Sequence, residues 1–338
     1  MLDLVFARNG CIHSEVQVKQ TLIRALLLAC VAGLAGIADA QTFPSRPIRL
    51  VVPYPPGGPT DIVARLIADR LPPLLGQPVV VDNRPGAVTN IGTEAVVRAA
   101  PDAHTILMAS FANALNKSLV PSITWDPVND LTGVTQISSA PTVMVVPAGS
   151  PADSLEAFVA LAKKQPGKLN YGVGGAGSSS HLAGELLKTM SGIDVVPIIY
   201  KGGGPAMLAL LQGDVQLMFD NMQTVMPLLK AGKVRALAVT SKTRTPALPQ
   251  VPAMHESLPG YELYSWYGFL APAMAPPEAI RILEQTVAKV LAQPEVRERF
   301  ATLDITAVGG SAAEFTAFYR TETEKWARVV KAANIKLE

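Results

Sequence analysis

The chain has 338 residues, of which 49% are hydrophobic and 17% are charged, and its formal net charge is +2 at pH 7. This hydrophobic content excludes an intrinsically disordered chain, and the balanced charge provides no basic surface for nucleic acid. The roughly 300 residues that follow the N-terminal segment exceed one ordinary core, which predicts two domains.

The N-terminal segment has the order of a secretory signal peptide. Lys19 and Arg24 precede an apolar run over residues 25–37, and Ala38-Asp39-Ala40 forms a small-x-small cleavage site. We predict that residues 1–40 are a signal peptide with an over-long start, and that the mature protein is periplasmic.

Two other interpretations of this segment stay open. A membrane anchor is disfavoured because the apolar run is shorter than the ~20 residues that a spanning helix needs. Lipid attachment at Cys30 ranks below cleavage after Ala40, because further mostly apolar residues would then follow the lipidated cysteine. Cleavage would remove both cysteines, Cys11 and Cys30, so we expect no disulfide, thiol nucleophile or thiolate metal site in the mature chain.

The first candidate site is a glycine-bearing loop, PYPPGGPTD, over residues 53–61. It follows the strand-like run Arg49–Val52 and leads into helical apolar spacing over Ile62–Leu71. First-turn amides of a helix lack an intrahelical partner and carry the positive end of the helix dipole, so such a loop attracts anions. We expect an anion against the amides around residues 57–60 and a helix cap from Thr60 or Asp61. An ordinary tight turn with a cap is the alternative. The candidate ligand-binding residues of this loop are Tyr54, Gly57, Gly58, Thr60 and Asp61, the last in a positioning role.

Two features follow the strand-like run Thr105–Ala109, which comes after the runs Arg49–Val52 and Pro78–Val81. Ser110 and Asn113 are candidates to contact the far end of a ligand, and a simple loop is the alternative. The long β-prone stretch Gly133–Val146, which is interrupted at Ser138–Pro141, predicts a strand that crosses from one domain to the other.

The second glycine-bearing loop, GVGGAGSSSH, covers residues 172–181, follows a strand-like run and leads into a helical apolar face over Leu182–Met190. Its glycines also satisfy G-x-G-x-x-G, the fingerprint of a dinucleotide site. That site needs an acidic residue at the end of the next strand, but Val195–Tyr200 is followed by Lys201, and Asp194 stands at its beginning. Nucleotide binding is therefore disfavoured. The candidate ligand-binding residues of this loop are Gly175, Ala176, Gly177, Ser178, Ser179 and His181.

Three more polar residues end predicted strands. Tyr200 and Lys201 are candidates, Lys201 as the partner of a second carboxylate, although a lone lysine is more often solvated. Asp220 ends the run Val215–Phe219 and is a candidate acceptor for a ligand amine or hydroxyl, with structural capping as the alternative.

The return strand, Val234–Thr240, completes a predicted two-stranded hinge. Domain I would combine residues 42–140 with 238–338, and domain II would be residues 141–237. Strand-like and helical runs alternate, which favours α/β domains with mainly parallel sheets. Ligands of such sheets bind beyond the carboxyl ends of the strands, where both glycine loops lie.

Several ordered motifs resemble one known family. They are Ser45-Arg46-Pro47-Ile48, PYPPGGPTD, VDNRPG from Val81, Tyr200-Lys201-Gly202 and GKVRALAVT from Gly232. Over nearly all of residues 42–338 they are similar to the Bug-type periplasmic solute receptors of tripartite tricarboxylate transporters. The resemblance implies a type II periplasmic-binding-protein fold that closes on an organic anion, often with its carboxylate held by loop amides and bridging waters.

The positions that match the family's ligand loops are Tyr54–Asp61 and Gly174–His181. Pro56 and Pro59 stand where small residues or glycine are common, and Pro59 lacks an amide donor. The resemblance implies membrane transporter subunits as partners and leaves the ligand open among carboxylates and amino acids. A monomer is expected.

Catalysis has little support in the sequence. His181 lies beside three serines, but sequence neighbours at a helix start are not a triad, and both G-x-S-x-G and H-E-x-x-H are absent. We therefore expect no enzyme, no cofactor and no metal, with a secreted hydrolase as a minor alternative. A sensor that presents its ligand to a signalling membrane protein stays open, because it needs the same closing receptor.

Overall fold

Strands and helices alternate along the chain as the sequence predicts. The structure is a computed structural model that describes residues 43–302, 305–332 and 335. The predicted signal peptide lies outside these residues. The fold below is that of the compact unit that begins at Arg46, which does not include Phe43–Ser45.

The described elements are as follows. The strands are β1 (Ile48–Val52), β2 (Val79–Asn83), β3 (Thr105–Ser110), β4 (Leu131–Pro147), β5 (Leu169–Val173), β6 (Val195–Ile199), β7 (Leu217–Asn221), β8 (Val234–Val239), β9 (Tyr264–Pro272) and β10 (Thr306–Gly309). The helices are α2 (Pro59–Ala68), α3 (Pro72–Leu75), α4 (Asn90–Val97), the 3-10 helix η1 (Phe111–Leu115), α5 (Asn116–Leu119), α6 (Leu155–Lys164), α7 (Ser179–Ser191), α8 (Gly203–Gln212), α9 (Met222–Lys230), α10 (Met254–Ser257), α11 (Pro277–Leu291), α12 (Pro294–Thr302) and α13 (Ala312–Ala332).

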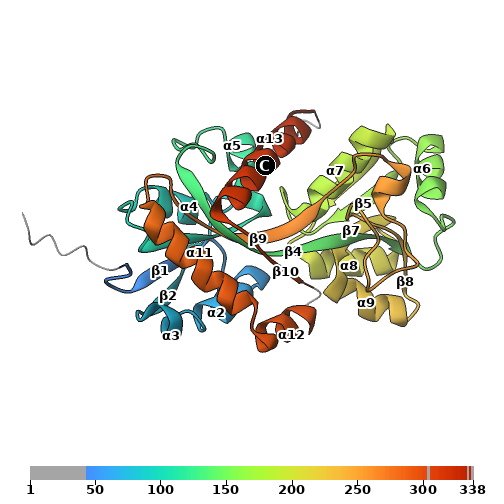
Figure 1. Ribbon diagram of the computed structural model, residues 1–338. Helices are drawn as coiled ribbons and strands as arrows, with labels where there is room; N and C mark the ends of the chain where they lie inside the picture. The colour runs from blue at the N-terminus through green and yellow to red at the C-terminus, as the bar shows by residue number, and fades with distance from the viewer. Residues whose placement is uncertain (1–42, 303–304, 333–334, 336–338) are drawn as a thin grey trace, which may run out of the picture. The chain divides into compact units, whose positions relative to one another are not determined.

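One long strand, β4, is shared by two lobes (Figure 1). Residues 131–141 pair with β9, and part of that stretch also pairs with β10. Residues 142–147 pair with β7 and β8 instead. We call the half of the sheet with β1, β2, β3, β9 and β10 the first lobe, and the half with β5 to β8 the second lobe. The strand order is β2-β1-β3-β9-β4-β7-β5-β6, with β8 and β10 both on β4.

The predicted interruption of β4 at residues 138–141 is wrong. Ser138 pairs with Tyr267, and the ladder to β9 continues as far as Pro141 and Tyr264. A proline is tolerated in a strand where its missing N–H is not needed. Pro141 meets this condition because it stands where β4 changes partners, just before the pairing with β7 begins at Thr142.

The chain returns to the first lobe through β9. β8 pairs with β4 beside residues 143–147, within the second lobe. After β8, the Thr240 amide donates to the Thr142 carbonyl over 2.9 Å, and the Leu263 amide donates to the Thr240 carbonyl over 3.0 Å. The Thr142 amide donates to the Thr240 hydroxyl over 2.8 Å. These bonds tie three segments together at the crossing. The domain boundaries at residues 140 and 238 stay predictions, and the pairing favours a later return, at Leu263–Tyr264.

The register makes the carboxyl ends of the two lobes' strands face one another. β3 runs parallel to β4, because both are antiparallel to β9, and it ends at Ser110 opposite Tyr267, the partner of Ser138. β7 runs antiparallel to β4 and ends at Asn221 opposite Thr142. These two rows are four residue steps apart along β4, from Ser138 to Thr142, which is about 13 Å at ~3.3 Å per residue. The loops after β1 and β5, which run parallel to β3 and β7, therefore face the same gap.

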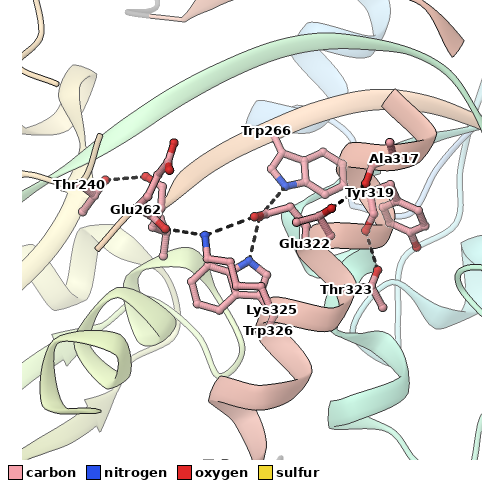
Figure 2. A network of polar contacts seen from close by, with 11 residues as sticks. Thr240, Glu262, Trp266, Ala317, Tyr319, Glu322, Thr323, Lys325 and Trp326 are labelled. Atoms are coloured by element: carbon pink, nitrogen blue, oxygen red, sulfur yellow. Dashed lines mark hydrogen bonds and ion pairs between the residues drawn. The ribbon is translucent and has the colours of Figure 1, made fainter. Parts of the chain in front are cut away.

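Helix α13 covers one face of the crossing and contacts β4 as well as α7 of the second lobe (Figure 1). Trp266 of β9 packs edge-on against Phe315 and Tyr319 of α13. Figure 2 shows the polar contacts of Trp266: Glu322 accepts from the indole nitrogens of Trp266 and Trp326. Successive side chains of a strand alternate between faces, so Ser265 and Tyr267 point away from α13.

Candidate functional site

The first glycine loop connects β1 to α2, as predicted, but its cap differs from the prediction. The N-cap is Gly58, with φ −76° and ψ 168°, and no side chain caps the helix. Neither Thr60 nor Asp61 can be the N-cap, because Pro59 already begins the helix and proline is well suited to that first position. The first helical bond runs from the Ile62 amide to the Gly58 carbonyl, so the amides of Gly58, Thr60 and Asp61 have no intrahelical partner, while Pro59 has no amide to offer.

Asp61 shapes this loop from inside. Its side chain is 3% exposed, and its Oδ2 accepts from the Gly57 amide at 2.8 Å and from Arg65 Nε at 2.9 Å. Asn83 Nδ2 donates to Oδ1 at 2.9 Å. Burial acts to raise the pKa of Asp61, but the hydrogen bonds from Arg65, Gly57 and Asn83 outweigh it and hold that pKa below its usual range. The Gly57 amide is therefore already used, which leaves the amides of Gly58, Thr60 and Asp61 as the donors for an anion.

A chain of hydroxyls runs from this loop to the neighbouring strand. The Tyr54 and Ser110 hydroxyls lie 2.7 Å apart, and the Thr60 hydroxyl is bonded to Tyr267. Burial raises the pKa of both tyrosines above the usual range. Asn113 is fully buried, and its Oδ1 accepts from the Ser110 amide at 2.8 Å, while its Nδ2 donates to Thr93 at 2.8 Å. Asn113 thus supports Ser110 from behind.

The second glycine loop connects β5 to α7, and its internal bonds are partly side chain to backbone. Ser178 is the N-cap and accepts from the His181 amide, at 3.4 Å. His181 Nδ1 accepts from the Gly177 amide at 3.1 Å, which places the ring inside the loop at 5% exposure. Burial lowers the pKa of His181, which favours the neutral ring. The amides of Ser179 and Ser180, in the first turn of α7, lack intrahelical acceptors.

Glycines allow two backbone loops of the second lobe to touch. A Cβ on Gly174 would lie 3.0 Å from the Gly203 amide nitrogen, at the start of α8. A Cβ on Gly203 itself would lie 3.8 Å from Asp220 Oδ2. The second loop, the start of α8 and Asp220 therefore form one wall. Tyr200 is half-buried and Lys201 is exposed beside this wall.

Asp220, in this wall, has a buried carboxyl group with a raised pKa and with one oxygen that is unpartnered among the described residues. Its Oδ1 accepts from the Asn221 amide at 2.7 Å, while the buried Oδ2 has no hydrogen-bond partner within the described ranges. Burial raises the pKa of Asp220 to about 6. A carboxylate held in this way lacks a donor, which a ligand hydroxyl or amine can supply.

A small cavity of about 110 Å³ lies between the lobes. Pro59 belongs to the first glycine loop, and sequence reasoning did not place the other lining residues at a ligand site. They come from α2, β4, the start of α9 and β9, with one residue beyond α12: Pro59, Ile62, Val63, Ser138, Ala140, Asn221, Met222, Gln223, Ser265, Tyr267 and Ile305. The one available signal was the polar residue Ser138 within a β-prone stretch, which the sequence analysis treated as an interruption.

A larger hollow of about 500 Å³ lies between α11, α12 and β10. None of the residues of either glycine loop lines it, and its lining belongs to the first lobe alone. A site that closes between lobes requires contacts from both, so this hollow is not the candidate.

Comparisons with known proteins agree with this geometry. The model of the tripartite tricarboxylate transporter family receptor matches residues 63–335. The chain belongs to this receptor family. The protein BugT of Bordetella pertussis is 37% identical over 315 residues, which cover 92% of this chain and 97% of BugT. The family resemblance and the type II periplasmic-binding-protein fold expected from sequence are thus confirmed.

Two solved structures of the family hold dicarboxylates. A Rhodopseudomonas palustris protein with adipate is 36% identical, has a TM-score of 0.74, and covers 87% of this receptor and 100% of its own chain. MatC of the same organism, with bound malate, is 31% identical with a TM-score of 0.72, over 85% of this receptor and 100% of MatC.

The described part of the receptor contains no group of three or more side chains placed to hold a metal ion. Within the same residues, no helix is both long enough and apolar enough to cross a lipid bilayer.

Proposed function

We propose that this receptor captures a small organic carboxylate in the gap between its lobes, closes on it, and delivers it to the membrane subunits of a tripartite transporter. One observation carries the proposal: the register of β4 turns the two helix-starting loops toward the same gap, because the parallel strands β3 and β7 beside them end only about 13 Å apart along β4 at ~3.3 Å per residue. Amides at helix starts attract anions, and two such loops can share one carboxylate. The dicarboxylates found with two relatives support the same ligand class.

The proposal assigns roles to the sequence-predicted residues. The amides of Gly58 and Thr60 would bind the carboxylate from the first lobe, and the amides around Ser179 would bind it from the second. Asp61 would keep the first loop in shape, as its buried contacts support. Asp220 would accept from a ligand hydroxyl or amine, so amino acids stay among the candidate ligands.

A thermal-shift screen of the receptor against organic acids, amino acids and nucleotides tests the proposal. A ligand at 100 times its Kd should stabilise the folded state by about 2.7 kcal/mol. Stabilisation by nucleotides alone, or chemical conversion of a carboxylate, would rule the proposal out. The second outcome would favour an enzyme.

Gly58→Val is the matching variant. Its φ is −76°, and a Cβ there would lie no closer than 3.6 Å, to the Pro55 carbonyl oxygen, so the variant should fold. Its side chain should block the approach of a ligand to the loop amides and abolish the shift. Gly149→Val is the control, because a Cβ there meets nothing within 4 Å and the residue lies in a turn after β4. An equal ligand-induced shift in Gly58→Val and in the control would show that the first loop does not bind the ligand.

A further inference from the structure

The cavity between the lobes has a definite size and position. Its volume is about 110 Å³, which at ~30 Å³ for a water-sized group gives room for roughly four non-hydrogen atoms. Pro59, at the start of α2, lines one side, and Asn221, at the end of β7, lines the other. It therefore adjoins the loop amides that we assign to the carboxylate, and it can hold only a short part of a ligand.

The floor of the cavity carries a buried hydroxyl without a partner. Ser138 pairs with Tyr267, and Ala140 pairs with Ser265, so these four side chains share the strand face that points away from α13. Ser138 is 1% exposed, and its Oγ has no hydrogen-bond partner among the residues that the structure describes. Leaving a buried hydroxyl unpaired is unfavourable, so a ligand atom that forms a hydrogen bond with Ser138 Oγ would remove this cost.

The described residues that line the cavity carry no positive charge that could pair with a ligand carboxylate. None of the described residues that line it is charged, and the polar groups are neutral hydroxyls and amides such as those of Asn221 and Tyr267. Among the described residues, the acidic side chains nearest along the chain are those of Asp61 and Asp220, which directly precede the lining residues Ile62 and Asn221. A carboxylate buried here would have no cation beside it, which is costly. A neutral hydroxyl or carbonyl of a ligand would avoid this cost, because it can form hydrogen bonds with the neutral groups of the lining.

We propose that this cavity holds the uncharged end of the ligand. The receptor then selects organic acids with a single carboxylate and a short carbon body that ends in a hydroxyl or carbonyl group. Ser138 is the residue that recognises this end, and the apolar side chains of Pro59, Ile62 and Met222 enclose the carbon body. The inference rests on the proposed function, because it takes the carboxylate end to be bound by the loop amides.

Calorimetric titration with three acids of equal carbon number tests the inference. Butyrate has an apolar end, 4-hydroxybutyrate has a neutral hydrogen-bonding end, and succinate has a second carboxylate. We expect 4-hydroxybutyrate to bind about tenfold more tightly than butyrate, the value of one good hydrogen bond. Succinate should bind more weakly than both.

A second test compares the binding of these acids to variants on the two faces of β4. Ser138→Ala should reduce the affinity for 4-hydroxybutyrate to that for butyrate, and leave the affinity for butyrate unchanged. Ser139→Ala is the control, because Ser139 pairs with Trp266 and so lies on the opposite face; it should change neither affinity. Ala140→Leu should fill the cavity and weaken the binding of both acids, with thermal melting of the free variants as the check that they fold.

The outcomes separate the two proposals. If none of the three acids nor any other carboxylate binds, the proposed function fails, and the inference fails with it. If succinate binds more tightly than 4-hydroxybutyrate, or if Ser138→Ala leaves the preference for the hydroxyl intact, the inference alone fails and carboxylate capture stands.

Discussion

The buried carboxylate of Asp61 holds the first glycine loop together by accepting from three donors. Asp61→Ala would leave the Gly57 amide and the Asn83 side chain without this acceptor and Arg65 without its ion pair. We expect a loss of about 2–3 kcal/mol in the free energy of unfolding, measured by urea denaturation, together with weaker carboxylate binding. A variant with unchanged stability would show that the loop keeps its shape without this carboxylate.

The same residue predicts an acid dependence. The folded-state pKa of Asp61 is lowered, so its contribution is present above the unfolded-state pKa of about 4 and is lost as the pH falls through the folded-state value. The difference in stability between the wild type and Asp61→Ala should therefore shrink below pH 4.

For Asp220 we predict the opposite dependence of stability on pH. Burial raises the pKa of Asp220 from 3.8 to about 6, so between these values the folded state binds more protons than the unfolded state, and stability falls as the pH rises. Asp220→Asn should stabilise the ligand-free receptor at pH 7 by at most about 3 kcal/mol, and should have little effect at pH 4. Urea denaturation at the two pH values measures this. Equal effects at pH 4 and pH 7 would show that Asp220 is not buried as an ionised group.

At the scale of elements, close packing between β9 and α13 depends on one glycine. A Cβ on Gly268 would lie 2.1 Å from the ring of Phe315. Gly268→Ala should therefore destabilise the receptor by about 1–3 kcal/mol through overpacking. Gly204→Ala in α8 is the control, since a Cβ there meets nothing within 4 Å and alanine is the better helix former. Denaturation curves that coincide for the two variants would contradict this packing.

The glycine loops were predictable from sequence, because strand, glycines and helical apolar spacing are all local signals. The strand-loop-helix order at residues 48–68 and 169–191 is confirmed. The continuity of β4 was not predictable from the sequence, because it depends on pairing with the distant strand β9, which begins at Tyr264. Ser138 was overlooked for the same reason: its isolation in a cavity is a property of distant neighbours. The ligand roles of the sequence-predicted residues stay predictions.

At the scale of the whole molecule, we predict closure of the lobes about the crossing near Thr142, Thr240 and Leu263. A ligand that contacts both lobes favours the closed state by its differential contacts, and few residues need to change conformation in a two-stranded hinge. Small-angle scattering should show a smaller radius of gyration at ligand saturation. Gly58→Val, which should not bind, is the control. An unchanged radius at proven saturation would mean that the lobes form one rigid body.

Export is a separate prediction. Cleavage after Ala40 should give a periplasmic chain that begins at Gln41, as shown by its intact mass. A chain that retains residues 1–40, or one that begins at a lipid-modified Cys30, would exclude it.

The sharing of β4 also sets an order in which the chain can assemble. Every strand segment of the second lobe lies between Thr142 and Val239, so that lobe has its complete set of strands as soon as this stretch has emerged. In the first lobe, β9 lies between β3 and β4, and both strands must wait for it with unpaired edges. Unpaired edges invite aggregation during folding. The half that is begun first in synthesis is thus finished last, and it is the half that most needs a chaperone.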